Sequence, residues 1–389
     1  MDNHLEAHDC ENTSKKAYKR HAVDMEYVAW FGRCVRTESD TVKYTMPGVR
    51  FGVIFTGSRY LRVRMCGGSN FFQIKLFKVC KDQLELIRSS TLNSTYETEW
   101  CEVVSDLQPE LIYQVVVIKK TEPELKSVMS NFSPVEVAAV RLEHKGRFQT
   151  VNAERMFYPN GWVEIIGDSD ACGFGVDGEI SHPSNIFTMD PSMEDVEYAW
   201  GTIVSELLGF GCVTIAWSGK GIVQNAPMCG ADCLPAIWKE QSRTFAPLPK
   251  PKLVVILAGG NDFFGSHYPS KQCFVDGFSE FLRELRKLHG DDVPIVVFSC
   301  SSNCVSSSGS PSMPPWEDLA TSTSCLLLSE YIDATINTFG GKTIFNAIID
   351  TSLIIEDDYG IMMHWNKKGQ QKVAQAMANI IADILVLET

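Results

Sequence analysis

The chain has 389 residues, of which 44% are hydrophobic, and it carries a formal net charge of −13 with a pI near 5.1. This length predicts two domains that each bury a substantial core. The acidic balance argues against a surface for nucleic acid or anionic lipid, because both require clustered Lys and Arg. A neutral or sugar-like partner fits this chain better.

No apolar run approaches the roughly 18 to 20 residues that cross a bilayer, and Met1–Arg20 lacks the apolar core of a signal peptide. The 13 cysteines are scattered from Cys10 to Cys325, and no histidine lies near their closest pairs to complete a zinc site. We expect no membrane span, no metal and free thiols. These features favour a cytoplasmic protein, whereas a secreted one stays open if a leader has been removed.

The N-terminal part is predicted to be all-β. Residues 1–22 are highly charged, lack apolar periodicity and indicate a disordered tail. Between residues 23 and 150, short runs alternate apolar and polar side chains with no intervening helix, which indicates an antiparallel sandwich. Strands are expected at Arg50–Phe55, Tyr60–Met65, Phe72–Leu76, Gln83–Ile87, Ile112–Lys119 and Val135–Leu142.

From residue 151 to 389 the pattern changes to apolar strands that alternate with helices. This pattern predicts an α/β domain with a parallel sheet covered on both faces. Helices are expected at Met193–Leu208, Lys271–Leu288 and Asn366–Leu387, and strands at Val163–Ile166, Val213–Trp217, Leu253–Leu257, Ile295–Phe298 and Ile344–Ile349. The Ser- and Pro-rich segment Ser299–Thr323 is expected to be a long loop.

Polar residues follow three of these strands. The motif Gly167-Asp168-Ser169 ends the first strand, Gly219 and Asn261 follow the next two, and His364 precedes the last helix. The carboxyl edge of an open α/β sheet is where such proteins bind ligands. Taken singly, the glycines and Asn261 fit ordinary turns, and His364 fits a contact at a helix end. Their placement after separate strands favours a common site.

These residue types suit acyl transfer. We expect Ser169 to be the nucleophile and His364 to act first as a base and then as an acid. The backbone N–H groups of Ser169 and Gly219 and the side-chain amide of Asn261 are expected to form an oxyanion hole.

A G-x-G-x-x-G pattern at Gly173–Gly178 competes with this interpretation. In dinucleotide-binding proteins the pattern directly follows a strand and opens a helix. Here Gly167–Cys172 intervenes after the strand, and Pro183 lies in the polar run that follows. We therefore expect no nucleotide and no other cofactor.

In this order, Ser169, Gly219, Asn261 and His364 resemble the four motifs of the SGNH hydrolases, also called GDSL esterases and lipases. A sandwich followed by Gly-Asp-Ser-Asp-Ala-Cys-Gly-Phe-Gly, Trp-Ser-Gly-Lys-Gly and Gly-Gly-Asn-Asp-Phe is similar to carbohydrate esterase family two, over about Met25–Thr389. The resemblance implies a jelly-roll-like domain ahead of a flavodoxin-like SGNH domain. It also implies removal of acetyl groups from plant-type polysaccharides, with the family's roles for these four residues.

The chain departs from the general SGNH pattern near the histidine. Most members carry an aspartate three residues before it, where this chain has Ile361, and a proline after it, where this chain has Trp365. The resemblance implies a Ser-His dyad in which a backbone carbonyl orients the imidazole. Asp357 or Asp358, from the preceding loop, is the alternative orienting group.

Three aromatic residues near the motifs, Trp217, Phe263 and Trp365, are expected to line an acyl pocket and a sugar-stacking face. Packing in the core is the alternative for all three.

The leading hypothesis from the sequence is a serine esterase that acts on O-acetyl groups of a carbohydrate without metal or cofactor. A small-ester or lipid esterase and an acyltransferase would use the same site. A non-catalytic carbohydrate-binding protein with a decayed catalytic site is the alternative from a different functional class.

Overall fold

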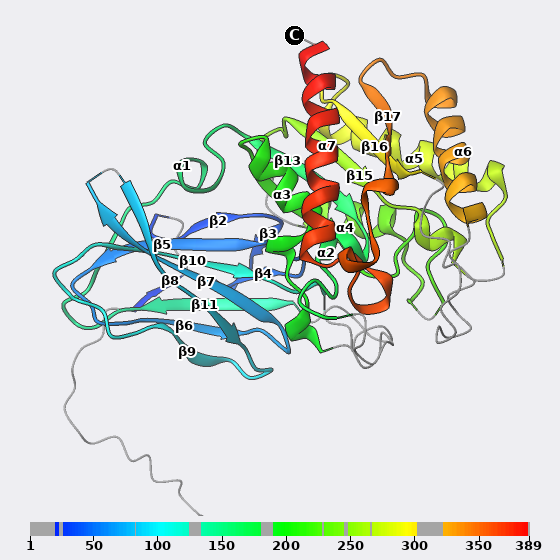
Figure 1. Cartoon of the computed structure of the whole chain (residues 1–389). Helices are drawn as coiled ribbons and strands as arrows, with labels where there is room; N and C mark the ends of the chain where they lie inside the picture. Colours follow the sequence, from blue (N-terminus) through cyan, green and yellow to red (C-terminus); the bar gives the residue numbers. More distant parts are fainter. Residues whose placement is uncertain are drawn as a thin grey trace, which may run out of the picture.

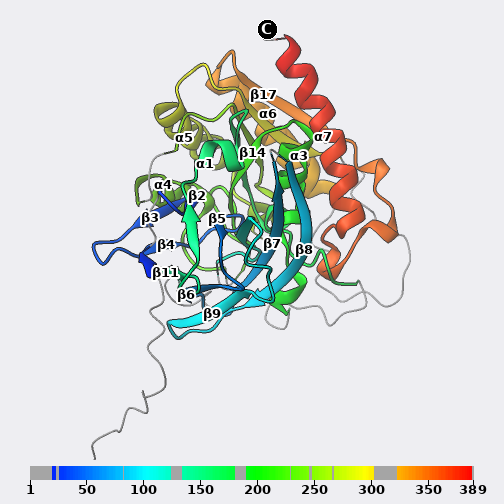
Figure 2. The ribbon, with the colours of Figure 1, turned by 90° about the vertical axis from the view of Figure 1, so that its left-hand side faces the viewer.

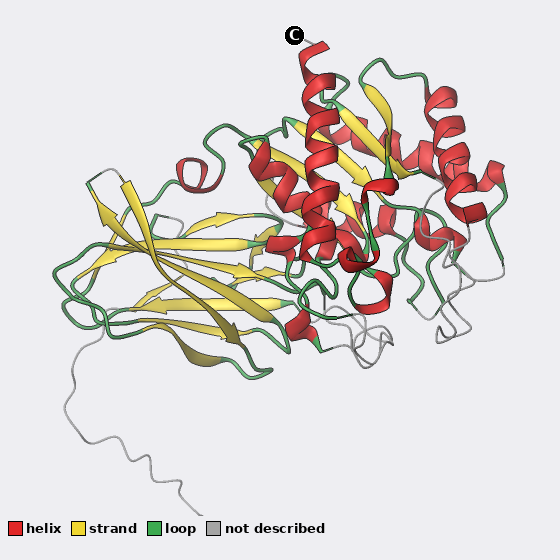
Figure 3. Cartoon of the chain, in the orientation of Figure 1, coloured by secondary structure: helices red, strands yellow, loops and turns green. Residues whose placement is uncertain are grey.

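The computed structural model describes residues 20–22, 26–81, 83–123, 134–179, 190–227, 229–244, 248–264, 267–301 and 322–387. Figure 1 shows an all-β part, coloured blue to cyan, beside a part with helices and strands, coloured green to red. In the second part the helices surround a central sheet (Figure 3). Both expected fold classes are therefore present.

The all-β part is a sandwich of two antiparallel sheets, which lies toward the viewer in Figure 2. In β6 (Leu61–Cys66) and in the first six residues of β7 (Phe71–Cys80) every second side chain is buried between the sheets, as the alternating pattern predicts. The first sheet has the order β3-β4-β11-β6-β9 with β1 beside β11, and the second has the order β12-β5-β10-β7-β8 with β2 beside β5. Their other strands are β1 (Arg20–Ala22), β2 (Ala29–Phe31), β3 (Cys34–Arg36), β4 (Val42–Tyr44), β5 (Arg50–Thr56), β8 (Gln83–Asn93), β9 (Glu99–Val104), β10 (Tyr113–Lys119), β11 (Val135–Arg141) and β12 (Arg147–Gln149).

The second part contains a five-stranded parallel sheet with the order β14-β13-β15-β16-β17. Counted along the chain, this is the flavodoxin-like arrangement, in which the strand order reverses beside the first strand. The strands are β13 (Trp162–Gly167), β14 (Gly211–Ala216), β15 (Leu253–Leu257), β16 (Ile295–Cys300) and β17 (Ile344–Ile349).

Helices cover both faces of this sheet because most strand side chains on each face are apolar. Val163 and Ile165 of β13 share a core with α3 (Trp200–Leu207) and α7 (Lys367–Leu387). Ile166, on the opposite face, belongs to the core that includes side chains of the remaining long helices. These are α4 (Leu234–Thr244), α5 (Lys271–His289) and α6 (Ser322–Phe339).

Two predictions about the N-terminal tail and the first helix are wrong. Arg20–Ala22 is not part of a disordered tail, because it forms β1 and pairs with β11. The helix expected from Met193 begins only at Trp200 and follows two short 3-10 turns. The carboxylates of Asp190 and Asp195 accept the backbone N–H groups of Ser192 and Glu197, which caps each short turn separately.

The other predicted elements agree with the structure to different degrees. The bounds of β15 and β17 are those expected, and α5 extends the expected helix by one residue. The short strands β2, β3, β4, β9 and β12 and the helices α4 and α6 were not predicted. Of the loop expected at Ser299–Thr323, residues 302–321 lie outside the described part, and its first two residues end β16.

The sandwich and the α/β part share a buried ionic contact. Arg33 of the sandwich bonds to Glu164, a fully buried residue of β13. The same carboxylate lies 2.8 Å from His289 Nε2 and accepts Trp238 Nε1 at 3.2 Å. Burial alone would raise the pKa of Glu164, but Arg33 and His289 lower it to about 2. The buried strand β13 therefore carries a charge that a residue of the sandwich compensates.

Among the described helices, none combines the length and the apolar composition that crossing a bilayer requires. Ten cysteines of the described segments are free thiols, as expected, and four of these ten are buried.

Candidate active site

Ser169 lies directly after β13, the first strand of the parallel sheet in chain order. β13 ends at Gly167, and Ser169 is the first residue of the short helix α2 (Ser169–Cys172). A Cβ at position 167 would lie 2.5 Å from the Cβ of Ala171 and 3.0 Å from the carbonyl oxygen of Leu257, so this turn requires glycine. As the first residue of a helix, Ser169 has a backbone N–H that the helix itself does not bond.

His364 reaches Ser169 from the last loop of the domain. Its Nε2 lies 2.7 Å from Ser169 Oγ, which is hydrogen-bond distance. The histidine follows a 3-10 turn, Ile361–Met363, in which Met362 has the left-handed φ of 53°. The imidazole packs against the ring of Phe174, with 4.6 Å between the ring centroids. The two residues expected to form a nucleophile-base pair therefore meet.

A backbone carbonyl, and not a carboxylate, contacts the other nitrogen of His364. Its Nδ1 lies 3.2 Å from the carbonyl oxygen of Ile361. The proposed orienting roles of Asp357 and Asp358 are wrong. The Asp358 carboxylate instead bonds Lys372 at 2.6 Å and the backbone N–H of Ile355 at 2.8 Å. Asp357 contributes its backbone carbonyl to the side chain of Asn366, at 2.8 Å.

Because a carbonyl oxygen only accepts hydrogen bonds, the Ile361 carbonyl places the proton of neutral His364 on Nδ1. The Nε2 lone pair is then directed to the Ser169 hydroxyl. This arrangement selects the reactive tautomer, which is one of the two functions of a triad carboxylate. It lacks the second function, a full negative charge beside the imidazolium.

The expected oxyanion donors lie on the loops after β13, β14 and β15. Gly219 has φ +74°, and a Cβ there would lie 2.2 Å from Cys229 Sγ, so both backbone conformation and space require glycine. The Nδ2 of Asn261 lies 3.0 Å from Asp168 Oδ2 and 3.1 Å from the carbonyl oxygen of Lys220. Asn261 thus connects the loop of the nucleophile to the loop of Gly219.

Solved structures with this architecture include a family two carbohydrate esterase from Cellvibrio japonicus, with TM-score 0.71, 16% identity and coverage of 96% of this chain and 100% of that one. A family two carbohydrate esterase from Clostridium thermocellum in complex with cellohexaose has a TM-score of 0.66 and 21% identity, with coverage of 92% of this chain and 99% of that one. An acetyl xylan esterase from the rumen bacterium Butyrivibrio proteoclasticus has a TM-score of 0.65 and 14% identity, with coverage of 95% of this chain and 98% of that one. This chain has the family two carbohydrate esterase fold. No family model and no curated protein matches its sequence.

Within this fold, the electrostatics of the site keep His364 neutral. Burial lowers the pKa of His364, and the nearby carboxylate of Asp168 opposes this effect. Burial and the neighbouring Asp170 raise the pKa of Asp168 to about 7, against the effect of His364. A neutral imidazole is the form that accepts the serine proton.

The three aromatic residues expected at the substrate face are buried instead. Phe263 is 1% exposed, and rings of three other aromatic residues surround it. Trp217 is 8% exposed and Trp365 is 7% exposed, and both belong to hydrophobic cores. The structure therefore supports the alternative of core packing, and these residues offer no open face on which a sugar ring could stack.

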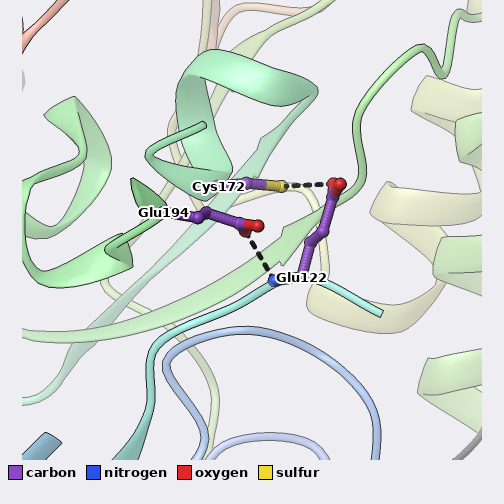
Figure 4. Close-up of side chains that lie close together, drawn as sticks. All are labelled: Glu122, Cys172 and Glu194. Carbon is purple, nitrogen blue, oxygen red and sulfur yellow. Dashed lines mark hydrogen bonds between the residues drawn. The ribbon is translucent and has the colours of Figure 1, made fainter. Parts of the chain in front are cut away.

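One group of described residues has side chains that resemble a metal site. Glu122, Cys172 and Glu194 each offer one ligand atom, and these atoms lie within 4.8 Å of one another (Figure 4). Carboxylates and thiolates are ligands of zinc. A basic group already lies beside this cluster, because Nζ of the buried Lys119 donates to the carbonyl oxygen of Glu122 at 2.9 Å. Burial lowers the pKa of Lys119 to about 7, although Glu194 and Glu122 act in the opposite direction.

The sequence analysis missed several contacts around the dyad. The Phe174 ring lies in the G-x-G-x-x-G segment, whose unusual placement after the serine was the available signal. The contact of Asp168 with Asn261 joins two motifs that were interpreted separately. Glu122 belongs to the other domain, and no signal in the sequence connected it to this site.

Proposed function

We propose that the protein is a serine esterase that removes O-acetyl groups from a carbohydrate. The observation that carries this proposal is the 2.7 Å contact between Ser169 Oγ and His364 Nε2 at the carboxyl edge of the sheet. The likeness to family two carbohydrate esterases supports the substrate class, since the solved structures include an acetyl xylan esterase and a complex with cellohexaose.

In the first half of the reaction, Ser169 Oγ attacks the acetyl carbonyl carbon while His364 Nε2 accepts the hydroxyl proton. The N–H groups of Ser169 and Gly219 stabilise the negative oxygen of the tetrahedral intermediate. The Asn261 amide joins them when one of its two hydrogens turns to that oxygen from Asp168 or from the Lys220 carbonyl. The intermediate collapses, and His364 gives its proton to the sugar oxygen as that oxygen leaves. The product is a free sugar hydroxyl and an acetyl group on Ser169.

In the second half, His364 Nε2 takes a proton from a water molecule that attacks the acetyl-serine. Collapse of the second tetrahedral intermediate releases acetate and returns the proton to Ser169 Oγ. The carbonyl of Ile361 keeps the imidazole oriented in both halves, since its contact is with Nδ1 and leaves Nε2 free to exchange protons.

The test is hydrolysis of 4-nitrophenyl acetate and acetylated xylan by the parent protein, Ser169→Ala and His364→Ala. We expect kcat/KM to fall about 10⁴-fold or more in both variants. Ser192→Ala and His144→Ala change exposed residues of the same types and serve as controls that retain activity. Higher activity on esters of longer acyl chains than on acetyl esters would favour a lipid esterase. Transfer of the acetyl group to an added sugar would favour an acyltransferase.

A second candidate function is non-catalytic carbohydrate binding. The observation that favours it is that His364 Nδ1 contacts a carbonyl oxygen where most SGNH hydrolases place a carboxylate. Binding of xylan or cellulose fragments by the parent protein, with no acetate released from any acetylated sugar, would make this the better account.

A further inference from the structure

The segment that follows β10 carries a side chain of the sandwich into the α/β part. Glu122 lies in this segment and is 1% exposed. In Figure 4 its carboxylate points toward Cys172 of α2. The sandwich therefore contributes a buried acidic group close to the helix that begins with Ser169.

One oxygen of Glu122 contacts both the loop of Gly219 and the helix of Ser169. Glu122 Oε2 accepts the backbone N–H of Ser218 at 2.6 Å, and Ser218 directly precedes Gly219. The same oxygen accepts Cys172 Sγ at 3.4 Å, at the last position of the helix that Ser169 opens. A hydrogen bond from an amide to a buried carboxylate is short and strong, so it restrains the orientation of the peptide that carries it.

Glu122 is itself held in place from both domains. Its backbone N–H donates to Glu194 Oε1 at 2.6 Å, and its carbonyl oxygen accepts Lys119 Nζ at 2.9 Å. The residue after Glu194 continues the chain of contacts, because the backbone N–H of Asp195 donates to the carbonyl oxygen of Gly173 at 3.1 Å. Gly173 caps the C-terminal end of α2, so the network contacts this end of the serine helix at two successive residues, Cys172 and Gly173.

We propose that Glu122 is a positioning residue that orients the Ser218-Gly219 peptide and the serine helix for oxyanion binding. The inference rests on the proposed esterase function. It gives the sandwich a role in catalysis. If the Glu122 side chain no longer reached Ser218, the Gly219 N–H would point away from the oxyanion, although Ser169 and His364 themselves were unchanged. Misplacement of a reacting or stabilising group by about 1 Å is enough to cost about 100-fold in rate.

The experiment compares two substitutions that separate the reach of the side chain from its acid group. Glu122→Asp keeps the carboxyl group but withdraws it from Ser218 by one methylene, and we expect kcat to fall about 10- to 100-fold with KM changed less than about threefold. Glu122→Gln keeps an acceptor oxygen at the same reach, and we expect it to retain kcat within about fivefold. If Glu122 served only the stability of the domain interface, we would not expect glutamine to retain kcat where aspartate loses it.

Glu197→Gln is the matched control. Glu197 is a half-buried acidic residue of the same interface that pairs with Lys75 and, at 3.3 Å, with Arg50 of the sandwich. Among the described residues, its ion-pair partners lie outside α2 and the Ser218 loop. We expect this variant to lose stability and to keep kcat. Equal losses of kcat in Glu197→Gln and Glu122→Asp would overturn the proposal, and so would full activity of Glu122→Asp.

Hydrogen–deuterium exchange of the peptide covering residues 217–221 provides a readout that needs no turnover. We expect faster exchange of this peptide in Glu122→Asp than in the parent or in Glu197→Gln, and equal exchange would overturn the inference.

A parent protein without esterase activity would defeat the proposed function, while the exchange result would still decide the role of Glu122. One metal ion per chain in the parent, found by elemental analysis and lost in Glu122→Gln, would overturn the proposal in favour of a metal site at Glu122, Cys172 and Glu194.

Discussion

The serine and histidine halves of the dyad are held in place by different kinds of structure. Ser169 follows β13, whose residues are all buried, and begins a helix that the fold requires at that position. His364 comes from a loop of 3-10 turns in which Met362 has a left-handed backbone conformation. The backbone carbonyl of Ile361 contacts Nδ1 of the His364 ring. The topology of the sheet thus determines where the nucleophile lies, whereas local loop geometry determines the orientation of the base.

Apart from substitution of Ser169 or His364 themselves, the largest expected effect comes from the oxyanion loop beside the serine. Gly219→Ala places a Cβ 2.2 Å from Cys229 Sγ at a residue with φ +74°, so the loop must shift and the Gly219 N–H leaves the oxyanion. We expect kcat to fall about 100- to 1000-fold, with the thermal midpoint changed far less than in a core variant. Steady-state kinetics on 4-nitrophenyl acetate measures this effect. Gly340→Ala, at another left-handed glycine with open space around it, is the control.

A change in the histidine half sharpens the comparison. Ile361→Asp puts a carboxylate where most SGNH hydrolases have one, but this side chain is 1% exposed and packs with Phe174. We expect a loss of about 2 to 4 kcal/mol in the free energy of unfolding and no gain in kcat. Denaturant unfolding and kinetics give both values. Ile361→Val, which keeps the carbonyl contact and most of the apolar volume, should retain activity.

The pH profile tests the electrostatics of the histidine half. His364 acts as a base only when neutral, and burial lowers its pKa below the ordinary value of 6.5. We therefore expect kcat/KM to rise with pH to a plateau, with its midpoint below pH 6.5. A midpoint above 6.5 would show that a negative charge dominates around the imidazole, and would contradict the arrangement described.

The smallest effect is expected at the aspartates that the structure separates from His364. Asp358→Asn breaks the ion pair with Lys372 and is expected to cost about 1 kcal/mol of stability or less, because Lys372 is partly exposed. Asp357→Asn leaves the backbone carbonyl contact with Asn366 unchanged. Both variants should keep kcat within about twofold, since neither carboxylate bonds His364. A drop of 100-fold in either would restore an aspartate as the orienting group.

The sequence predicted the regular elements well where local signals agree with the fold. Leu253–Leu257 is a continuous apolar run, and Ile344–Ile349 is apolar except for Asn346. Both lie between polar or glycine-containing segments, and both are strands with those bounds. The helix expected from Met193 failed because aspartate side chains cap short turns in competition with the helix. The helix α6 was missed because its Ser- and Thr-rich sequence has low intrinsic helix propensity.

The candidate site was predictable to the extent that its chemistry lies in side chains at strand ends. The pairing of Ser169 with His364 followed from motif order and sheet topology. The carbonyl of Ile361 has no side-chain signature, and only the family resemblance suggested a carbonyl in this role. Glu122 lies in the other domain, and only the three-dimensional packing of the sandwich brings it to Ser218.

The most direct test of the account is to identify the covalent intermediate. The parent protein is mixed with 4-nitrophenyl acetate, quenched with acid at the end of the pre-steady-state burst, digested and analysed by mass spectrometry. The account predicts one acetyl group on Ser169, about one equivalent of 4-nitrophenol in the burst, and neither in Ser169→Ala. Hydrolysis without an acetyl group on Ser169, or an acetyl group that persists on another residue of the Ser169→Ala variant, would contradict it.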